Sequence, residues 1–221
     1  MTYPELKIAL DIGDPKAILP KACKKYCKNR WLYVSDDGNC HLFDEDGHEH
    51  SIDKIRNIPN SYFAMEESLK TINLPSKIHR IGECAFRHCK SLQIITIPNS
   101  VKSIGPYAFS LCCSLKKAVV GNGITTLPWG IFENCVNLKD ISLPDSISTI
   151  ANWAFANCGK MKSISIGSNI KEMGVFTFSG CTRLEQIFFK GMTMKQVKAI
   201  KNYPWGIPWR FLNKSIIQAE L

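Results

Sequence analysis

Apolar residues recur along most of the chain with a fixed period of 23 residues. Phenylalanine holds one position of this period and cysteine another, at Phe63, Phe86, Phe109, Phe132, Phe155 and Phe178, and at Cys89, Cys112, Cys135, Cys158 and Cys181. A constant period of this size indicates that each unit is one supersecondary element, which buries its apolar face only by stacking on its neighbours. The chain is therefore predicted to be mostly a solenoid. An enzyme is the less favoured class, because a solenoid offers a long surface rather than an enclosed pocket.

Each unit predicts a strand, a second apolar pair and a short turn segment. The unit that begins at Leu92 reads Leu-x-x-Ile-x-Ile, and its last two apolar residues alternate with a polar one, as a strand with one buried face requires. Pro98 ends this strand because proline removes a donor from the ladder. Val101 and Ile104 form the second apolar pair. The segment 105–109 is too short for a long helix, and we expect a helical turn or two.

The repeat unit resembles that of a known family. Residues 92–112, LQIITIPNSVKSIGPYAFSLC, look like the 23-residue unit of the BspA-type leucine-rich repeat proteins, and copies cover the region 52–190. The resemblance implies an α/β fold: a right-handed leucine-rich-repeat solenoid with a parallel sheet on its concave side. It also implies a role in protein binding, in a family usually found at the bacterial cell surface. It does not identify the partner.

Residues 1–51 lack the repeat and are predicted to form an N-terminal cap. Asp14 followed by Pro15 is typical of a helix start, and apolar residues follow at helical spacing: Leu19, Ala22, Cys23, Tyr26 and Cys27. Residues 31–34 and 40–43 indicate the two strands of a β-hairpin. We therefore expect a helix and a hairpin that cover the first coil and the edge of its sheet.

Residues 191–221 are predicted to form a C-terminal cap. Thr193 and Gln196 fit a capping box, so a short helix should follow and should end before Pro204. Two apolar residues would lie on one face of this helix: Val197 and Ile200.

The segment 203–209 contains two of the five tryptophans, Trp205 and Trp209. One interpretation is that they seal the apolar core of the last coil, which would otherwise be open to solvent. The other is that they form an exposed aromatic patch for a partner.

The chain is basic, with 28 Lys and Arg against 19 Asp and Glu in 221 residues. The excess lies in the repeats and the C-terminal region. Four lysines fall at the same repeat position and suggest a stripe along one edge of the sheet: Lys70, Lys116, Lys139 and Lys162. A nucleic-acid surface would interleave such a stripe with aromatic residues, whereas the aromatic residues here are mostly assigned to the core. Nucleic acid is therefore not the expected partner, and attraction to an acidic protein or polyanion is the alternative.

The cysteines of the repeat are predicted to be reduced and buried. Equivalent residues of successive coils lie near the distance that a disulfide spans, yet five in a row cannot pair completely, and parallel side chains lack the geometry of a disulfide. Thiols are small and apolar enough to fill such core positions.

The N-terminal cap holds the side chains that suit a metal: Cys23, Cys27, Cys40, His41, His48 and His50. Neither the Cys-x-x-x-Cys spacing nor the His-Glu-His sequence matches a zinc motif, so no metal or cofactor is expected. The segment 44–47 resembles the start of a calcium loop, but Ile55 stands where the bidentate glutamate belongs, which indicates a turn.

No segment has the apolar run of a secretory signal or the length of a membrane span. The sequence as given therefore predicts a cytoplasmic protein, and a secreted or surface protein if an export signal precedes it. No Gly-x-Ser-x-Gly elbow, phosphate-binding loop or Rossmann glycine triplet is present. Catalysis is not expected.

The candidate binding residues are those that alternate with the inward residues of each strand. They are Ile94, Thr96, Lys117, Val119, Asp140, Ser142, Ser163, Ser165, Gln186 and Phe188. Three functions remain open: a protein-interaction module that uses these positions, a polyanion or nucleic-acid binder that uses the lysine stripe, and a metal-binding N-terminal cap.

Overall fold

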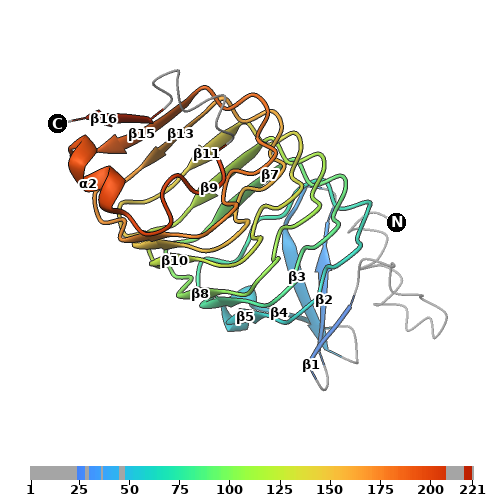
Figure 1. Cartoon of the computed structure of the whole chain (residues 1–221). Coiled ribbons are helices and arrows are strands. Elements are labelled where there is room, and N and C mark those ends of the chain that lie inside the picture. The colour runs from blue at the N-terminus through green and yellow to red at the C-terminus, as the bar shows by residue number, and fades with distance from the viewer. Residues whose placement is uncertain (1–23, 28–29, 36, 45–47, 208–216, 221) are drawn as a thin grey trace.

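A computed structural model describes residues 24–27, 30–35, 37–44, 48–207 and 217–220. The chain winds into a stack of coils, with a β-sheet at the N-terminal end of the stack and a short helix at the other end (Figure 1). This is the predicted leucine-rich-repeat solenoid, with less helix than the sequence suggested.

Four antiparallel strands form the N-terminal sheet: β1 (Lys24–Cys27), β2 (Arg30–Val34), β3 (Cys40–Asp44) and β4 (Glu49–His50). The hairpin of β2 and β3 confirms the sequence prediction. The helix prediction was wrong for Tyr26 and Cys27, because both lie in β1, which pairs with β2, and Cys27 stands opposite Arg30. The rest of that helix, from Asp14 to Cys23, lies outside the described residues. A single 3-10 turn, η1 (Ile52–Lys54), leads into the coils.

The repeat strands occur in five coils: β7 (Ile94–Ile97), β9 (Lys117–Val120), β11 (Asp140–Ser142), β13 (Ser163–Ile166) and β15 (Gln186–Lys190). They are parallel and in register, so Ile94 pairs with Lys117 and Lys117 with Asp140. The coil before β7 has no strand, although Ile72 and Leu74 are buried as predicted. Its backbone bonds the N-terminal hairpin instead, with the Asn73 N–H donating to the Gly38 carbonyl at 2.6 Å.

A second row of parallel strands runs beside the first, and the sequence analysis did not predict it. These strands are β5 (Asn57–Ile58), β6 (Arg80–Ile81), β8 (Ser103–Ile104), β10 (Thr126–Leu127), β12 (Thr149–Ile150) and β14 (Glu172–Met173). Each contains the second member of the apolar pair, for example Leu127, which is buried. Both rows are interrupted once among the described strands, the first between β11 and β13 and the second between β8 and β10.

The turn segments are not helical, which corrects the prediction for residues 105–109. Alternate N–H groups donate to the next coil, Tyr107 to Trp129 at 2.8 Å and Phe109 to Ile131 at 3.0 Å, whereas the Ser110 N–H donates back to the Tyr107 carbonyl at 3.1 Å. A left-handed residue before each core phenylalanine, such as Tyr107 with φ 56°, turns the backbone into this arrangement. Each turn segment therefore bonds neighbouring coils, as the strands do.

The phenylalanine series forms a continuous stack through the core. Ring centroids are 5.1 Å apart between Phe63 and Phe86 and 5.9 Å apart between Phe155 and Phe178. All six rings are buried. Leu32 and Leu42 of the N-terminal sheet belong to the same core, so the sheet closes this end of the solenoid.

The C-terminal region closes the other end. Helix α2 (Met194–Ala199) begins with the predicted Thr193–Gln196 capping box, and Val197 and the C-cap Ile200 are buried. Strand β16 (Ile217–Glu220) adds to the edge of β15 (Figure 1). Within the described ranges, no helix has the length and apolar character to cross a membrane.

Candidate binding surface

The outward side chains of β7, β9, β11, β13 and β15 form one continuous surface, here called the strand face. Burial alternates along each strand, as in β7, where Ile95 and Ile97 are buried while Ile94 and Thr96 are exposed. The sequence pattern dictates this, since successive side chains of a strand point to opposite faces. All ten candidate residues therefore lie on the strand face.

The apolar members of the strand face differ in how much they are covered. Ile94 is 51% exposed, whereas Val119 and Phe188 are half-buried. Phe188 stands opposite Gln218 of β16, so the C-terminal strand flanks it. The accessible apolar part of the strand face is thus the end near Ile94 and Val119, which pair with Lys117 and Thr96 respectively.

The interruption between β11 and β13 produces a hollow of about 270 Å³ in the strand face. It is lined by Lys117, Lys139, Asp140, Ile141, Ser142, Ser163, Ile164 and Ser165. Ile141 and Leu143 are only half-buried here, whereas their counterparts Ile164 and Ile166 are buried. The backbone edges of two strands and a group of hydroxyls are therefore available to a ligand at this point.

A row of lysines borders the strand face. Lys70, Lys116, Lys139 and Lys162 all lie exposed, just before the strand position of their coils. Lys116 contacts Gln93 of the preceding coil, Nζ to Oε1, at 3.5 Å. The structure therefore keeps these charges aligned on one side of the strand face, which gives that border a positive potential.

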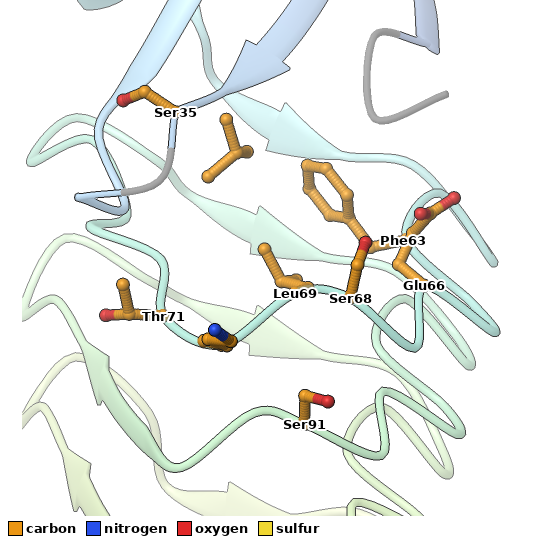
Figure 2. Close-up of a pocket in the computed structure, with 9 residues that line it drawn as sticks. Ser35, Phe63, Glu66, Ser68, Leu69, Thr71 and Ser91 are labelled. Carbon is orange, nitrogen blue, oxygen red and sulfur yellow. The ribbon is translucent and has the colours of Figure 1, made fainter. Parts of the chain in front are cut away.

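A separate cleft of about 450 Å³ lies between the N-terminal sheet and the first coils (Figure 2). Phe63 and Leu69 form its apolar part, and Ser35 contributes from the end of β2. The remaining lining residues are Val34, Glu66, Ser68, Lys70, Thr71 and Ser91. The cleft combines one carboxylate, one ammonium group and several hydroxyls. Sequence analysis did not find it because it is formed between two regions.

The candidate metal ligands of the N-terminal cap do not gather into one site in the part that the structure describes. Cys40 is buried and donates to the Asn73 carbonyl at 3.4 Å, and burial raises its pKa to about 12. His41 Nδ1 lies 2.8 Å from a Glu49 carboxylate oxygen, while His48 is outside β4. No group of three or more possible ligands occurs among the described residues. Cys23 lies outside them, and the side chain of Cys27 is not described.

A second exposed feature, missed by the sequence analysis, lies on the turn segments. Tyr107, Trp129, Trp153 and Phe176 come from four successive coils and form what is here called the aromatic strip. Trp129 is 49% and Phe176 is 50% exposed. Tyr107, Trp153 and Phe176 each precede a core phenylalanine by two residues, and this shared position is the signal that could have revealed them.

The repeats were compared with known families and structures. Residues 102–204 match the family described as BspA type leucine rich repeat region (6 copies). The repeats in this matched region are therefore BspA-type leucine-rich repeats, as the 23-residue unit indicated. Among curated proteins, no sequence matches the chain.

Several solved bacterial structures share the fold. A leucine-rich repeat protein of Eubacterium ventriosum is 23% identical with a TM-score of 0.53, over 70% of this chain and 50% of that one. The leucine-rich repeat protein of T. pallidum is 22% identical with a TM-score of 0.50, over 81% of this chain and 97% of that one.

A leucine rich cell surface protein of Faecalibacterium prausnitzii is 22% identical with a TM-score of 0.46, over 76% of this chain and 54% of that one. This chain thus spans about half of two of these three structures. At these identities, the likeness to the Eubacterium ventriosum and T. pallidum proteins shows the solenoid fold alone.

Proposed function

We propose that this protein binds another protein through the strand face and does not act as an enzyme. Leucine-rich repeat proteins in general mediate protein interactions, and the repeats here belong to that class. The proposal rests on Ile94, which is half-exposed and lies near Val119 of the neighbouring strand. In β7 the fold requires only the side chains of the opposite face, Ile95 and Ile97, to be buried. An apolar residue left at such a position is typical of a binding hot spot.

The surroundings of Ile94 and Val119 specify the partner's chemistry further. Lys117 stands opposite Ile94 on the neighbouring strand, Asp140 stands opposite Lys117 on the next strand, and the lysine row borders all three strands. We infer a partner surface with an apolar centre, an acidic border toward the lysines and a basic group toward Asp140. The hollow between β11 and β13 would accept a polar side chain or an exposed backbone edge.

The test uses the immobilised protein and the lysate and surface fractions of its source organism, followed by a binding assay with the protein it captures. The double variant Val119→Thr, Asp140→Asn keeps side-chain size and removes one apolar and one charged contact. We expect it to bind at least tenfold more weakly, with nearly unchanged thermal stability. The matched control, Lys102→Gln with Thr125→Ala, alters exposed residues next to the second strand row and should bind normally. Equal binding of both variants would contradict the strand-face proposal.

The lysine row supports a second candidate, a polyanion such as heparin. Replacing Lys116, Lys139 and Lys162 by glutamine separates the two. If a polyanion is the ligand, binding is lost in this triple variant and falls steeply with salt in the wild type. If a protein is bound through the strand face, the triple variant should mainly slow association.

A further inference from the structure

The aromatic strip is not part of the core. The phenylalanine stack already fills the interior, and the strip lies outside it on the turn segments. Trp129 and Trp153 meet edge to face at 5.8 Å, and Trp153 stacks on Phe176 at 6.2 Å. Tyr107, Trp153 and Phe176 have φ between 56° and 59°. Bulky residues rarely adopt this conformation, so the fold holds these rings in place at some cost in free energy.

The strip also offers hydrogen-bond donors. The indole N–H of Trp205 donates to the Lys201 carbonyl at 3.0 Å. The indole N–H groups of Trp129 and Trp153 have no acceptor among the described residues. A ligand for the strip should therefore present accessible acceptors next to apolar groups. A polyproline II segment does so, because it has no internal hydrogen bonds and all its carbonyls are free.

The strip offers a row of rings for such a segment. Its ring centroids lie 5.8 Å apart between Trp129 and Trp153 and 6.2 Å apart between Trp153 and Phe176. One turn of polyproline II contains three residues of about 3.1 Å each, or about 9.3 Å. A segment running along the stack would therefore contact the strip over successive coils with one or two turns, without a strict match between its turns and the coils.

The charge near the strip indicates the flanking residues of the ligand. Tyr107 packs over Gly130, and a Glu133 carboxylate oxygen lies 3.4 Å from where a Cβ of Gly130 would stand. Glu133 forms no ion pair with any described residue. In a chain with a formal charge of +9, this carboxylate beside the rings favours a ligand that carries Lys or Arg.

We propose that the aromatic strip is a second binding surface, which takes a proline-rich segment with a basic flank in the polyproline II conformation. This surface lies on the turn segments and is separate from the strand face. Aromatic grooves that use this mode exploit a peptide already ordered before binding, so little entropy is lost.

The probe is a synthetic acetylated peptide of the sequence Arg-Pro-Pro-Leu-Pro-Pro-Leu-Pro-Arg. Its control replaces every proline by serine or glycine. The indole N–H signals of the full-length protein are followed by NMR and assigned with single Trp→Phe variants. We expect the proline-rich peptide to shift the signals of Trp129 and Trp153 in a saturable way, and the control peptide to shift neither.

Variants then locate the site. Trp129→Ala should weaken peptide binding tenfold or more, Trp129→Phe should have an intermediate effect, and Glu133→Gln should weaken binding and reduce its salt dependence. Phe176→Ala is the second variant if Trp129→Ala does not fold. Ile94→Ala, on the strand face, is the matched control and should leave the peptide affinity unchanged.

Four results would overturn the proposal. They are the absence of indole shifts at millimolar peptide, equal affinity for the control peptide, saturable binding of cellohexaose in place of the peptide, and self-association that Trp129→Ala abolishes. None of these results bears on the strand face, whose variants are measured with a different ligand.

Discussion

At the scale of single residues, the cysteines of the repeat donate a second hydrogen bond to carbonyls of the core phenylalanines. Each thiol donates to the phenylalanine carbonyl of the preceding coil, from 3.0 Å for Cys89 and Phe63 to 3.3 Å for Cys158 and Phe132. The Phe132 carbonyl also accepts the backbone N–H of Cys135 at 3.1 Å, so the thiol occupies the second lone pair of a carbonyl oxygen. Cysteine suits this position because it is small, apolar and still a weak donor.

The ladder cysteines should therefore be unreactive in the folded protein. Burial raises the pKa of Cys181 to about 12, and the pKa of Cys158 is raised as well, so little thiolate forms at neutral pH. Labelling with a thiol reagent at pH 8 should modify the half-buried Cys84 and Cys113 first and the ladder only after denaturation. Mass spectrometry of the digested protein identifies the labelled sites. Rapid native labelling of Cys135, or a disulfide between two ladder residues, would contradict this prediction.

The middle of the phenylalanine stack gives a second prediction. Phe132 is fully buried between Phe109 and Phe155. Phe132→Ala should lower the free energy of unfolding by about 3 to 5 kcal/mol, because neighbouring rings on both sides are fixed and cannot fill the cavity. Urea denaturation measures the change. Val136→Ala, an exposed site in the same coil, serves as the control and should change stability by less than about 0.5 kcal/mol.

At the scale of elements, the strands were predictable and the turn segments were not. Alternation around Ile95 and Ile97 determines which side chains point outward, and burial follows that pattern in β7, β9 and β13. In the turns, N–H groups such as that of Phe109 donate to the next coil. Hydrophobic periodicity cannot reveal this, because a helical turn would bury the same phenylalanine. The second strand row was missed for a related reason, since two-residue strands are too short to show alternation.

The candidate site was predictable only in part. Which residues face outward follows from the strand period, but the opening between β11 and β13 does not. The coil that carries Asp140 repeats the same apolar pattern as its neighbours, so nothing in the sequence distinguishes it. The aromatic strip was missed because the repeat aromatics were mostly assigned to the core, whereas Trp153, two positions before Phe155, is partly exposed. At the N-terminus, antiparallel pairing of β1 with β2 outweighed the helical spacing of Tyr26 and Cys27.

The C-terminal cap imitates one more coil. In the coil before the last, the Phe155 N–H donates to the Thr177 carbonyl at 3.0 Å, and in the last coil the Phe178 N–H donates to the Trp205 carbonyl at 3.3 Å. Trp205 thus stands where the next turn segment would be. Its side chain is fully buried and lies 5.4 Å from Phe189, centroid to centroid. For Trp205, the interpretation as a core seal is confirmed, and Trp209 lies outside the described residues.

At the scale of the whole molecule, the solenoid carries two surfaces built by different parts of the same repeat. The strand face derives from the outward positions of the first strand row, and the aromatic strip derives from the turn segments. The outward positions recur in every 23-residue unit, but the residues that occupy them vary, whereas the inward positions keep their apolar residues. The two proposed surfaces would allow one chain to bind two partners at the same time.

The effect of a mutation on local stability should also depend on its position along the stack. In a repeat stack, each coil contacts only its neighbours, so damage at one end should remain near that end. Trp205→Ala removes the side chain that covers Phe189. It keeps the backbone hydrogen bond from the Phe178 N–H to the carbonyl at position 205. We expect amide hydrogen exchange of Ile187 and Phe189 in β15 to accelerate at least tenfold, while that of Ile95 and Ala118 in β7 and β9 stays unchanged.

Trp129→Ala is the matched control for this experiment, because its ring is half-exposed and covers no coil end. It should leave exchange in β15 as it is in the wild type. Equal acceleration in all coils of Trp205→Ala would mean that the stack unfolds as a single unit, with coupling between coils stronger than the loss of one cap. Unchanged exchange in β15 would mean that β16 alone seals the end. The expected result lies between these two: local opening that spreads from Phe189 over the last one or two coils and stops there.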